Sequence, residues 1–265
     1  MTAIAYRLAS PRLVRAEILK LRRRRRLVAT LLLLTVGTSV ITYAILALLH
    51  ATQPSQHGAA GGVENLGNAL GLLSAFGGVA GVLVGTTAGA GDLGAGVFRE
   101  LVVTGRSRTA LFLARIPGGL AVVLSAVAAG YAIAAIASVA LAGSLAAPSA
   151  GSLVAGGAWL LLSTAVFFVL GLGLASLIGS RTTPLAVLLA VQFVLTPILL
   201  SLSSMGAGRD VLPEAALRQL SPAAFDDSLR MPGLSMPTAV AVLVIAAWVA
   251  VSLGLGAWRT ATRDA

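Results

Sequence analysis

Six long runs without a charged residue constrain this chain more than any other feature of its sequence. The first, residues 27–49, is long enough at about 1.5 Å per residue to cross a hydrocarbon core of about 30 Å as a helix. Similar runs follow at residues 69–90, 116–140, 153–178, 183–202 and 238–258. Only 11% of the residues are charged, against about 25% in soluble domains. The sequence therefore predicts an all-α polytopic membrane protein with six spans in a single transmembrane domain, residues 1–265.

The distribution of basic residues predicts which side of the membrane each connection faces. Nine lysines and arginines lie in residues 1–26, four in residues 91–115, one at position 181 and two after residue 258. These are 16 of the 19 basic residues, and they share one side if the spans alternate; the other three lie in residues 203–237. Because cytoplasmic connections are enriched in Lys and Arg, both termini are predicted to be cytoplasmic. We therefore attribute the net charge of +10 to contacts with anionic lipid headgroups and to topology, and a nucleic-acid partner is not expected.

The segment before the first span has the pattern of an amphipathic helix at the membrane surface. Ser10 and Pro11 are typical of a helix N-cap and of the first helical position. At 100° per residue, apolar and basic side chains fall on opposite arcs: Leu13, Val14, Ile18 and Leu21 against Arg12, Arg15, Lys20 and Arg22. Glu17 is an exception inside the apolar arc, where it is expected to pair with an arginine or to contact a partner. We expect the five arginines of residues 22–26 to hold this helix against an anionic leaflet.

Residues 91–115, GDLGAGVFRELVVTGRSRTALFLAR, form a charged island between two long apolar runs. Asp92 is expected to be the N-cap of a short helix that ends at Thr104 and Gly105. The two sides of this predicted helix are Phe98, Leu101 and Val102, which are apolar, and Arg99 and Glu100, which are charged.

The end of the same segment leads into the third span. Ser107 is expected to cap that apolar helix. Arg106 and Arg108 lie where an acidic partner or a membrane surface would hold them. Two interpretations of the segment stay open at this point: a docking element on the cytoplasmic side, or a basic loop that only determines topology.

Small and polar residues distinguish two of the spans. In the second span, glycine recurs at every fourth position, at Gly77, Gly81, Gly85 and Gly89. Small residues at this spacing let another helix approach closely, so the stripe is interpreted as packing within one subunit, with a subunit interface or a pore lining as alternatives. In the fifth span, Gln192 is interpreted as a hydrogen bond between helices or as part of a path, and Pro197 as a kink or a helix end.

The connection of residues 203–237 is the longest on the outer side. Its sequences PEAALRQL and SPAAFDDSL both have proline in the first helical turn and mixed polarity. We expect two short surface helices over the outer mouth, with a plain solvated loop as the alternative.

Several kinds of chemistry are excluded or disfavoured by the residues themselves. The chain has no cysteine, and His50 and His57 are too few for a zinc site, so neither a metal site nor a catalytic group is predicted. The single lysine, Lys20, has no glycine-rich loop around it, which excludes a Walker A nucleotide site. No predicted span carries a charged residue in its middle, which disfavours ion-coupled transport and intramembrane hydrolysis. The chain is therefore not expected to be an enzyme.

The layout resembles the type 2 permease class of ATP-binding-cassette (ABC) exporters, in the small bacterial form whose permease and ATPase are separate polypeptides. The resemblance covers nearly the whole chain and rests on AEILKLRRRRR, residues 16–26, and on residues 91–115. The second segment is similar to the family's motif of an acidic residue, a glycine, a short basic and apolar helix, and a Ser and Arg pair. It departs from the motif at Arg115, where many relatives carry lysine, and at residues 104–106, where many have a proline.

The resemblance implies roles for individual residues. The segment would be the coupling element seated on the ATPase subunit, through Asp92, Gly96, Phe98, Arg99, Glu100, Arg106 and Arg108. The N-terminal helix, with Glu17, Lys20 and Arg22, would be a connecting element at the cytoplasmic surface. The second and fifth spans would face the substrate path.

The resemblance also implies a function and partners. The chain would be a permease subunit in a bacterial cell membrane, forming the path for ATP-driven export of an amphiphilic drug, antibiotic, lipid or peptide. Its partners would be an ABC ATPase, a second permease copy and membrane lipids. It would bind no cofactor itself, because ATP and Mg would be bound by the ATPase. Two alternatives come from other classes: a secondary transporter or channel, and a membrane scaffold or assembly factor that transports nothing.

Overall fold

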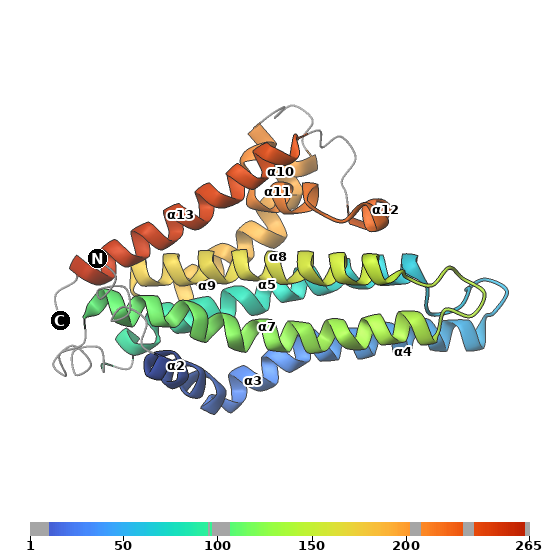
Figure 1. Ribbon diagram of the computed structural model, residues 1–265, viewed down its shortest axis with the longest axis horizontal. Helices are drawn as coiled ribbons and strands as arrows, with labels where there is room; N and C mark the ends of the chain where they lie inside the picture. Colours follow the sequence, from blue (N-terminus) through green and yellow to red (C-terminus); the bar gives the residue numbers. More distant parts are fainter. Residues whose placement is uncertain (1–10, 95, 97–106, 202–207, 230–235, 263–265) are drawn as a thin grey trace.

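A computed structural model describes residues 11–94, 96, 107–201, 208–229 and 236–262 of the chain (Figure 1). All regular structure within these residues is helical, which confirms the all-α prediction. The elements, in chain order, are α2 (Pro11–Arg23), α3 (Arg25–Leu32), the π-helical turn η1 (Leu33–Gly37), α4 (Thr38–Thr52), α5 (Val63–Gly94), α7 (Arg108–Ala140), α8 (Ala150–Ile178), α9 (Thr182–Ala190), the π-helical turn η2 (Val191–Leu195), α10 (Thr196–Ser201), α11 (Pro213–Gln219), the 3-10 turn η4 (Ala223–Phe225), α12 (Asp226–Leu229) and α13 (Thr238–Thr262).

Six helical stretches in the described part of the chain are long and apolar enough to cross a membrane, as the sequence predicts. They are Arg25–Thr52, Val63–Asp92, Arg108–Ala140, Ala150–Ile178, Thr182–Leu200 and Thr238–Thr262. The shortest has 19 residues, which at about 1.5 Å per residue still approaches the thickness of a hydrocarbon core. Several stretches extend beyond the uncharged runs, because charged residues at their ends remain helical. The third span, for example, begins at Arg108 and not at residue 116.

The helices α5 and α8 form the centre of the bundle and are the most buried of the six spans. The glycine stripe of α5, residues 77, 81, 85 and 89, faces α8, and the last three of these glycines face its main chain. A Cβ on Gly81 would lie 2.6 Å from the carbonyl oxygen of Thr164, and one on Gly89 would lie 2.6 Å from that of Leu172. No side chain fits at these distances, so the two helices meet backbone against backbone. The stripe therefore packs within the chain, and its role in a path stays a prediction.

Two irregularities shape the first span and the helix before it. Arg24 leaves the helical conformation, with φ −78° and ψ 80°, and so separates α2 from α3. The π-helical turn η1 then presses Thr35 against α7 at Gly130, where a Cβ would lie 2.7 Å from the Thr35 carbonyl carbon. The Ser39 hydroxyl donates a hydrogen bond to the Gly130 carbonyl oxygen at 2.8 Å. The first span is therefore held by close backbone contact with α7.

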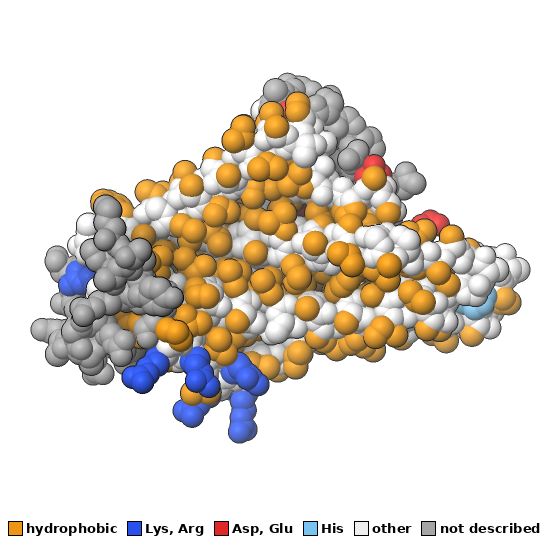
Figure 2. Space-filling view, viewed as in Figure 1, with side chains coloured by type: hydrophobic (Ala, Val, Ile, Leu, Met, Phe, Trp, Pro, Cys, Tyr) orange, Lys and Arg blue, Asp and Glu red, His pale blue; other side chains and the backbone are white. Residues whose placement is uncertain are grey.

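The two ends of the bundle carry different side chains. One end holds α2, the start of α7 and the end of α13, where Arg108 Nη1 donates to the Ala261 carbonyl oxygen at 3.3 Å. The opposite end holds the α4–α5 and α7–α8 connections, where the amide of Gly61 donates to the Leu141 carbonyl oxygen at 2.8 Å. Figure 2 shows Lys and Arg gathered over α2, and hydrophobic side chains along the face between the two ends. An apolar band of this kind is what lipid contact requires.

The connection between α10 and α13 contains short helices, as the sequence predicts. Pro213 begins α11, as expected for a proline in the first helical turn. However, Ala215, Ala216 and Leu217 of α11 are buried against apolar residues of the spans. The second predicted helix is the short turn η4 followed by α12, and its Phe225 and Leu229 are also buried. The prediction of two short helices is therefore confirmed, and each of them packs an apolar side against the bundle. Their position over an outer mouth stays a prediction.

Candidate functional site

The structure describes only part of the segment predicted to dock on an ATPase. Phe98, Arg99, Glu100 and Arg106 lie outside the described residues. Gly96 is exposed and has φ +70°, a conformation that glycine adopts without steric cost. Ser107 is confirmed as the N-cap of α7, since its hydroxyl accepts a hydrogen bond from the Ala110 amide at 3.2 Å. The helices α5 and α7 therefore hold the two ends of residues 95–107, which we call the α5–α7 segment.

Asp92 does not cap a helix after the second span, so this sequence prediction is wrong. It lies in the last turn of α5, which continues to Gly94. Its buried carboxylate accepts hydrogen bonds from Lys20 of α2 and from Arg115 of α7. These two cations, 72 and 23 residues away in sequence, compensate the burial of the carboxylate. Long-range charge pairing, and not local capping, determines the position of Asp92.

Asp92 belongs to a charged cluster that joins α2, α5 and α7, and that we define as Glu17, Lys20, Asp92 and Arg115. Lys20 Nζ lies 3.0 Å from Asp92 Oδ1 and 2.6 Å from Glu17 Oε2. Arg115 Nη2 lies 2.9 Å from Asp92 Oδ2, and Arg115 Nη1 donates to the Gly89 carbonyl oxygen at 3.2 Å. The Asp92 and Arg115 side chains are 6% and 1% exposed. Water therefore screens this pair much less than it screens a surface pair.

The charged cluster is reinforced by close packing of α2 on α7. Gly118 of α7 faces Glu17, and a Cβ at this glycine would lie 2.6 Å from the Cβ of Glu17. Leu21 of α2 is completely buried beside the cluster's helices, whereas Arg22 is exposed. Lys20 belongs to the polar arc by periodicity, but it turns inward to Asp92. The end of α5 cannot move without carrying or breaking these contacts, so α2 is linked to the end of α5 and to α7.

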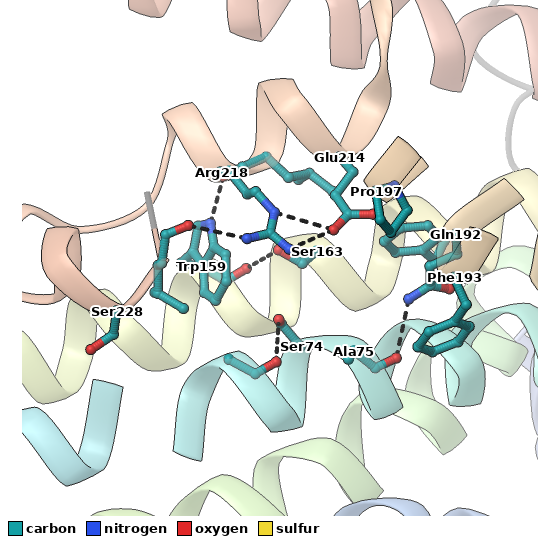
Figure 3. Close-up of a pocket in the computed structure, with 14 residues that line it drawn as sticks. Ser74, Ala75, Trp159, Ser163, Gln192, Phe193, Pro197, Glu214, Arg218 and Ser228 are labelled. Atoms are coloured by element: carbon teal, nitrogen blue, oxygen red, sulfur yellow. Dashed lines mark hydrogen bonds and ion pairs between the residues drawn. The ribbon is translucent and has the colours of Figure 1, made fainter. Parts of the chain in front are cut away.

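A second polar site lies toward the opposite end of the bundle, beneath α11 and α12. A pocket of about 170 Å³ opens there between α5, α8, η2, α10 and these two helices (Figure 3). Gln192 of η2 lines it and is buried, and its Nε2 donates to the Ala75 carbonyl oxygen at 3.2 Å. Gln192 thus makes a hydrogen bond between two spans and also faces a cavity. Whether that cavity belongs to a transport path stays a prediction.

The remaining polar groups of the pocket come from α8 and α11. Arg218 donates to Glu214 Oε1 from Nε at 3.1 Å and from Nη2 at 2.8 Å. The indole nitrogen of Trp159 donates to the Leu217 carbonyl oxygen at 2.8 Å, which ties α11 to α8. The fifth span continues past Pro197 to Ser201, with the turn η2 before the proline. Pro197 therefore does not end this helix. Proline has no backbone N–H to donate, and the wider hydrogen-bond spacing of the π-helical turn before it accommodates the missing bond.

Comparison with known families decides the class of the protein. A family model described as "ABC-2 family transporter protein" matches residues 12–265. The chain belongs to the ABC-2 transporter family. A search of curated proteins found no match.

As an ABC-2 permease, the chain is a multi-pass membrane component of a transporter and not its ATPase. Membership of this family implies an ABC ATPase partner. The resemblance seen in the sequence is therefore confirmed at the level of the family.

Sequence reasoning did not identify several polar residues of this ABC-2 permease. Arg115 was expected in a connection before the third span, but it lies inside α7 and is buried. Glu214 and Arg218 lie in one of the predicted short helices, and their spacing of four residues is a signal for the ion pair that they form. Trp159 carried no signal of its own, because tryptophan is common in apolar helices.

Proposed function

We propose that this ABC-2 permease forms, together with a second copy, the path for ATP-driven export of an amphiphilic substrate from a bacterial cell. A separate ABC ATPase binds the α5–α7 segment and hydrolyses ATP. The permease alternates between two states of the path, and closure of the ATPase pair changes their relative populations.

The observation that carries this proposal is the charged cluster. It ties α2 to the ends of both helices that flank the α5–α7 segment, through Lys20, Asp92 and Arg115. Movement of an ATPase subunit against this segment is thereby passed to α2, α5 and α7 together. A loop that served topology alone would need no buried ion pair at its base. The direct test is ATP-dependent accumulation of an amphiphilic dye in inverted vesicles that contain the permease and its ATPase.

The proposal includes an orientation, with both termini in the cytoplasm. A reporter fused after Ala265 is expected on the cytoplasmic side, and one inserted beside Gln56 on the external side. The reason is the excess of basic residues at the α2 end of the bundle, since Gln56 lies in the α4–α5 connection at the opposite end. Alkaline phosphatase and fluorescent-protein fusions measure this directly. Two reporters on the same side would contradict the six-span arrangement.

The proposed docking on the ATPase predicts a specific loss of partner binding. Reversing two charges of the α5–α7 segment, Arg99→Glu with Arg106→Glu, is expected to remove most of the ATPase that co-purifies with the permease. One exposed ion pair contributes only about 0.2–1 kcal/mol, but juxtaposed like charges cost several. The measurement is the ATPase-to-permease ratio after affinity purification.

The matched control reverses two exposed arginines at the start of α3, Arg25→Glu with Arg26→Glu, and so makes the same change in net charge. This control is expected to retain the ATPase. A topology reporter on both variants separates docking from orientation. If the segment variant kept the wild-type ATPase-to-permease ratio, the segment would not be the docking site. The same conclusion would follow if the variant chain were inverted in the membrane with its ATPase still bound.

A further inference from the structure

The pocket beneath α11 contains two buried acceptor atoms that no described residue satisfies. Gln192 is 7% exposed, and its Nε2 is bonded to Ala75, but its Oε1 accepts no hydrogen bond from the described residues. In Glu214, Oε1 accepts both bonds from Arg218, while Oε2 is buried and likewise accepts none from the described residues. A buried acceptor that has lost its water is costly unless something donates to it. Because both residues also line the cavity, an occupant with hydrogen-bond donors could satisfy these two oxygens.

Three of the donors that already lie around the pocket are engaged elsewhere. The Ser163 hydroxyl donates to the Trp159 carbonyl oxygen at 2.9 Å, and the Ser74 hydroxyl donates to the Gly71 carbonyl oxygen at 2.9 Å. The Trp159 indole is bonded to Leu217. Figure 3 shows these side chains and the Glu214–Arg218 fork around the cavity. The arrangement disfavours an anion, because an anion would have to displace the Glu214 carboxylate from the Arg218 guanidinium.

The walls of the pocket suit a cation with an apolar tail. Phe167, Phe193 and Trp159 line the cavity, and aromatic faces attract ammonium groups. Phe193 is also 48% exposed on the outside of the span, next to the exposed Val194. An apolar chain can therefore leave the pocket along the hydrophobic surface of η2 while its head stays inside.

We propose that this pocket binds the protonated primary amine of an amphiphilic molecule, with N–H donors directed at Gln192 Oε1 and Glu214 Oε2. The inference deepens the proposed function by naming a substrate class, and it rests on that function for the step of export. Two sources share this chemistry: a free alkylamine, and the ethanolamine headgroup of a membrane lipid.

Binding can be measured on the full-length chain in phosphatidylcholine nanodiscs, whose quaternary headgroups carry no N–H donor. Trp159 lines the pocket, so its fluorescence reports on occupancy, and Trp159→Phe removes the signal and leaves the background of Trp248 and Trp258. Dodecylammonium at pH 7 is expected to give a saturable change. Dodecyltrimethylammonium, with the same charge but no donor, is expected to bind at least tenfold more weakly, and dodecyl sulfate to give no saturable signal.

Two variants and two matched controls test the acceptors themselves. Gln192→Leu and Glu214→Gln are each expected to weaken dodecylammonium binding five- to tenfold. Gln219→Leu, at the end of α11, and Glu64→Gln, exposed in the first turn of α5, make the same chemical changes outside the pocket lining and are expected to bind as the wild type does. Thermal unfolding of every variant identifies any loss of folding. Since each acceptor is tested separately, one misfolded variant leaves the other informative.

The remaining outcomes are also decisive. Equal binding of dodecylammonium and dodecyltrimethylammonium, or no saturable signal with any probe, would overturn the proposal and leave water alone as the occupant. Displacement of dodecylammonium by added phosphatidylethanolamine assigns the lipid headgroup as the source, and no displacement assigns the free amine. These measurements use neither ATPase nor nucleotide. A permease that binds the amine but shows no ATP-dependent transport would contradict the proposed function and leave the site standing.

Discussion

Replacing Asp92 with leucine is expected to lower the free energy of unfolding of the permease by about 3–5 kcal/mol, which is the usual cost of removing one partner from a buried ion pair. For a chain of this length, such a loss corresponds to a fall of roughly 10 °C in the unfolding midpoint. The measurement is thermal unfolding of the purified chain in detergent, followed by intrinsic fluorescence.

The size of this effect follows from the burial of Arg115. Its side chain is 1% exposed and lies 2.9 Å from Asp92 Oδ2, so the substitution removes a carboxylate that is in direct contact with a buried guanidinium. Lys20 is affected less, because it is partly exposed and retains Glu17 at 2.6 Å. The main cost of Asp92→Leu therefore falls on Arg115.

A double variant separates charge pairing from packing. Asp92→Leu combined with Arg115→Met is expected to recover much of the stability, since replacing both members of a buried pair with apolar residues is often neutral. Arg12→Met, at an exposed position of α2, is the control for losing an arginine and is expected to change little. If Asp92→Leu unfolded at the wild-type temperature, the charged cluster would not hold α2, α5 and α7 together.

Replacing Gly85 with alanine is expected to destabilise the bundle, although alanine is the better helix former by about 1 kcal/mol. The added Cβ would overlap the Phe168 carbonyl oxygen and lie 2.8 Å from the Leu172 amide nitrogen. Both atoms belong to the α8 main chain, which cannot move aside as a side chain can. Overpacking of this kind costs typically about 1–3 kcal/mol, and α5 and α8 must separate along their length to relieve it. Thermal unfolding again provides the measurement.

Gly254 is the matched control for this substitution. It lies inside α13, and a Cβ there would meet no atom within 4 Å. Gly254→Ala is therefore expected to be neutral or slightly stabilising. If Gly85→Ala left the unfolding midpoint unchanged but prevented association of two permease copies, the stripe would belong to a subunit interface and not to the α5–α8 contact.

The features that the sequence determined are those that depend on neighbouring residues. Six uncharged runs were sufficient to predict six spans, because a helix satisfies its own backbone in lipid and its length follows directly from the number of residues. Ser107 as the cap of α7 and Pro213 as the start of α11 could be predicted for the same reason. Each depends on atoms within one turn of helix.

Which helix faces meet was decided only by the tertiary structure. Periodicity showed a glycine stripe but could not name α8 as its partner, since apolar faces of different spans are equivalent in lipid. Local reasoning made Asp92 a cap, whereas its partners lie on α2 and α7. The pocket of Gln192 and Glu214 likewise brings together residues from four parts of the chain. Burial of polar groups depends on contacts distant in sequence, and these exist only once the helices have packed.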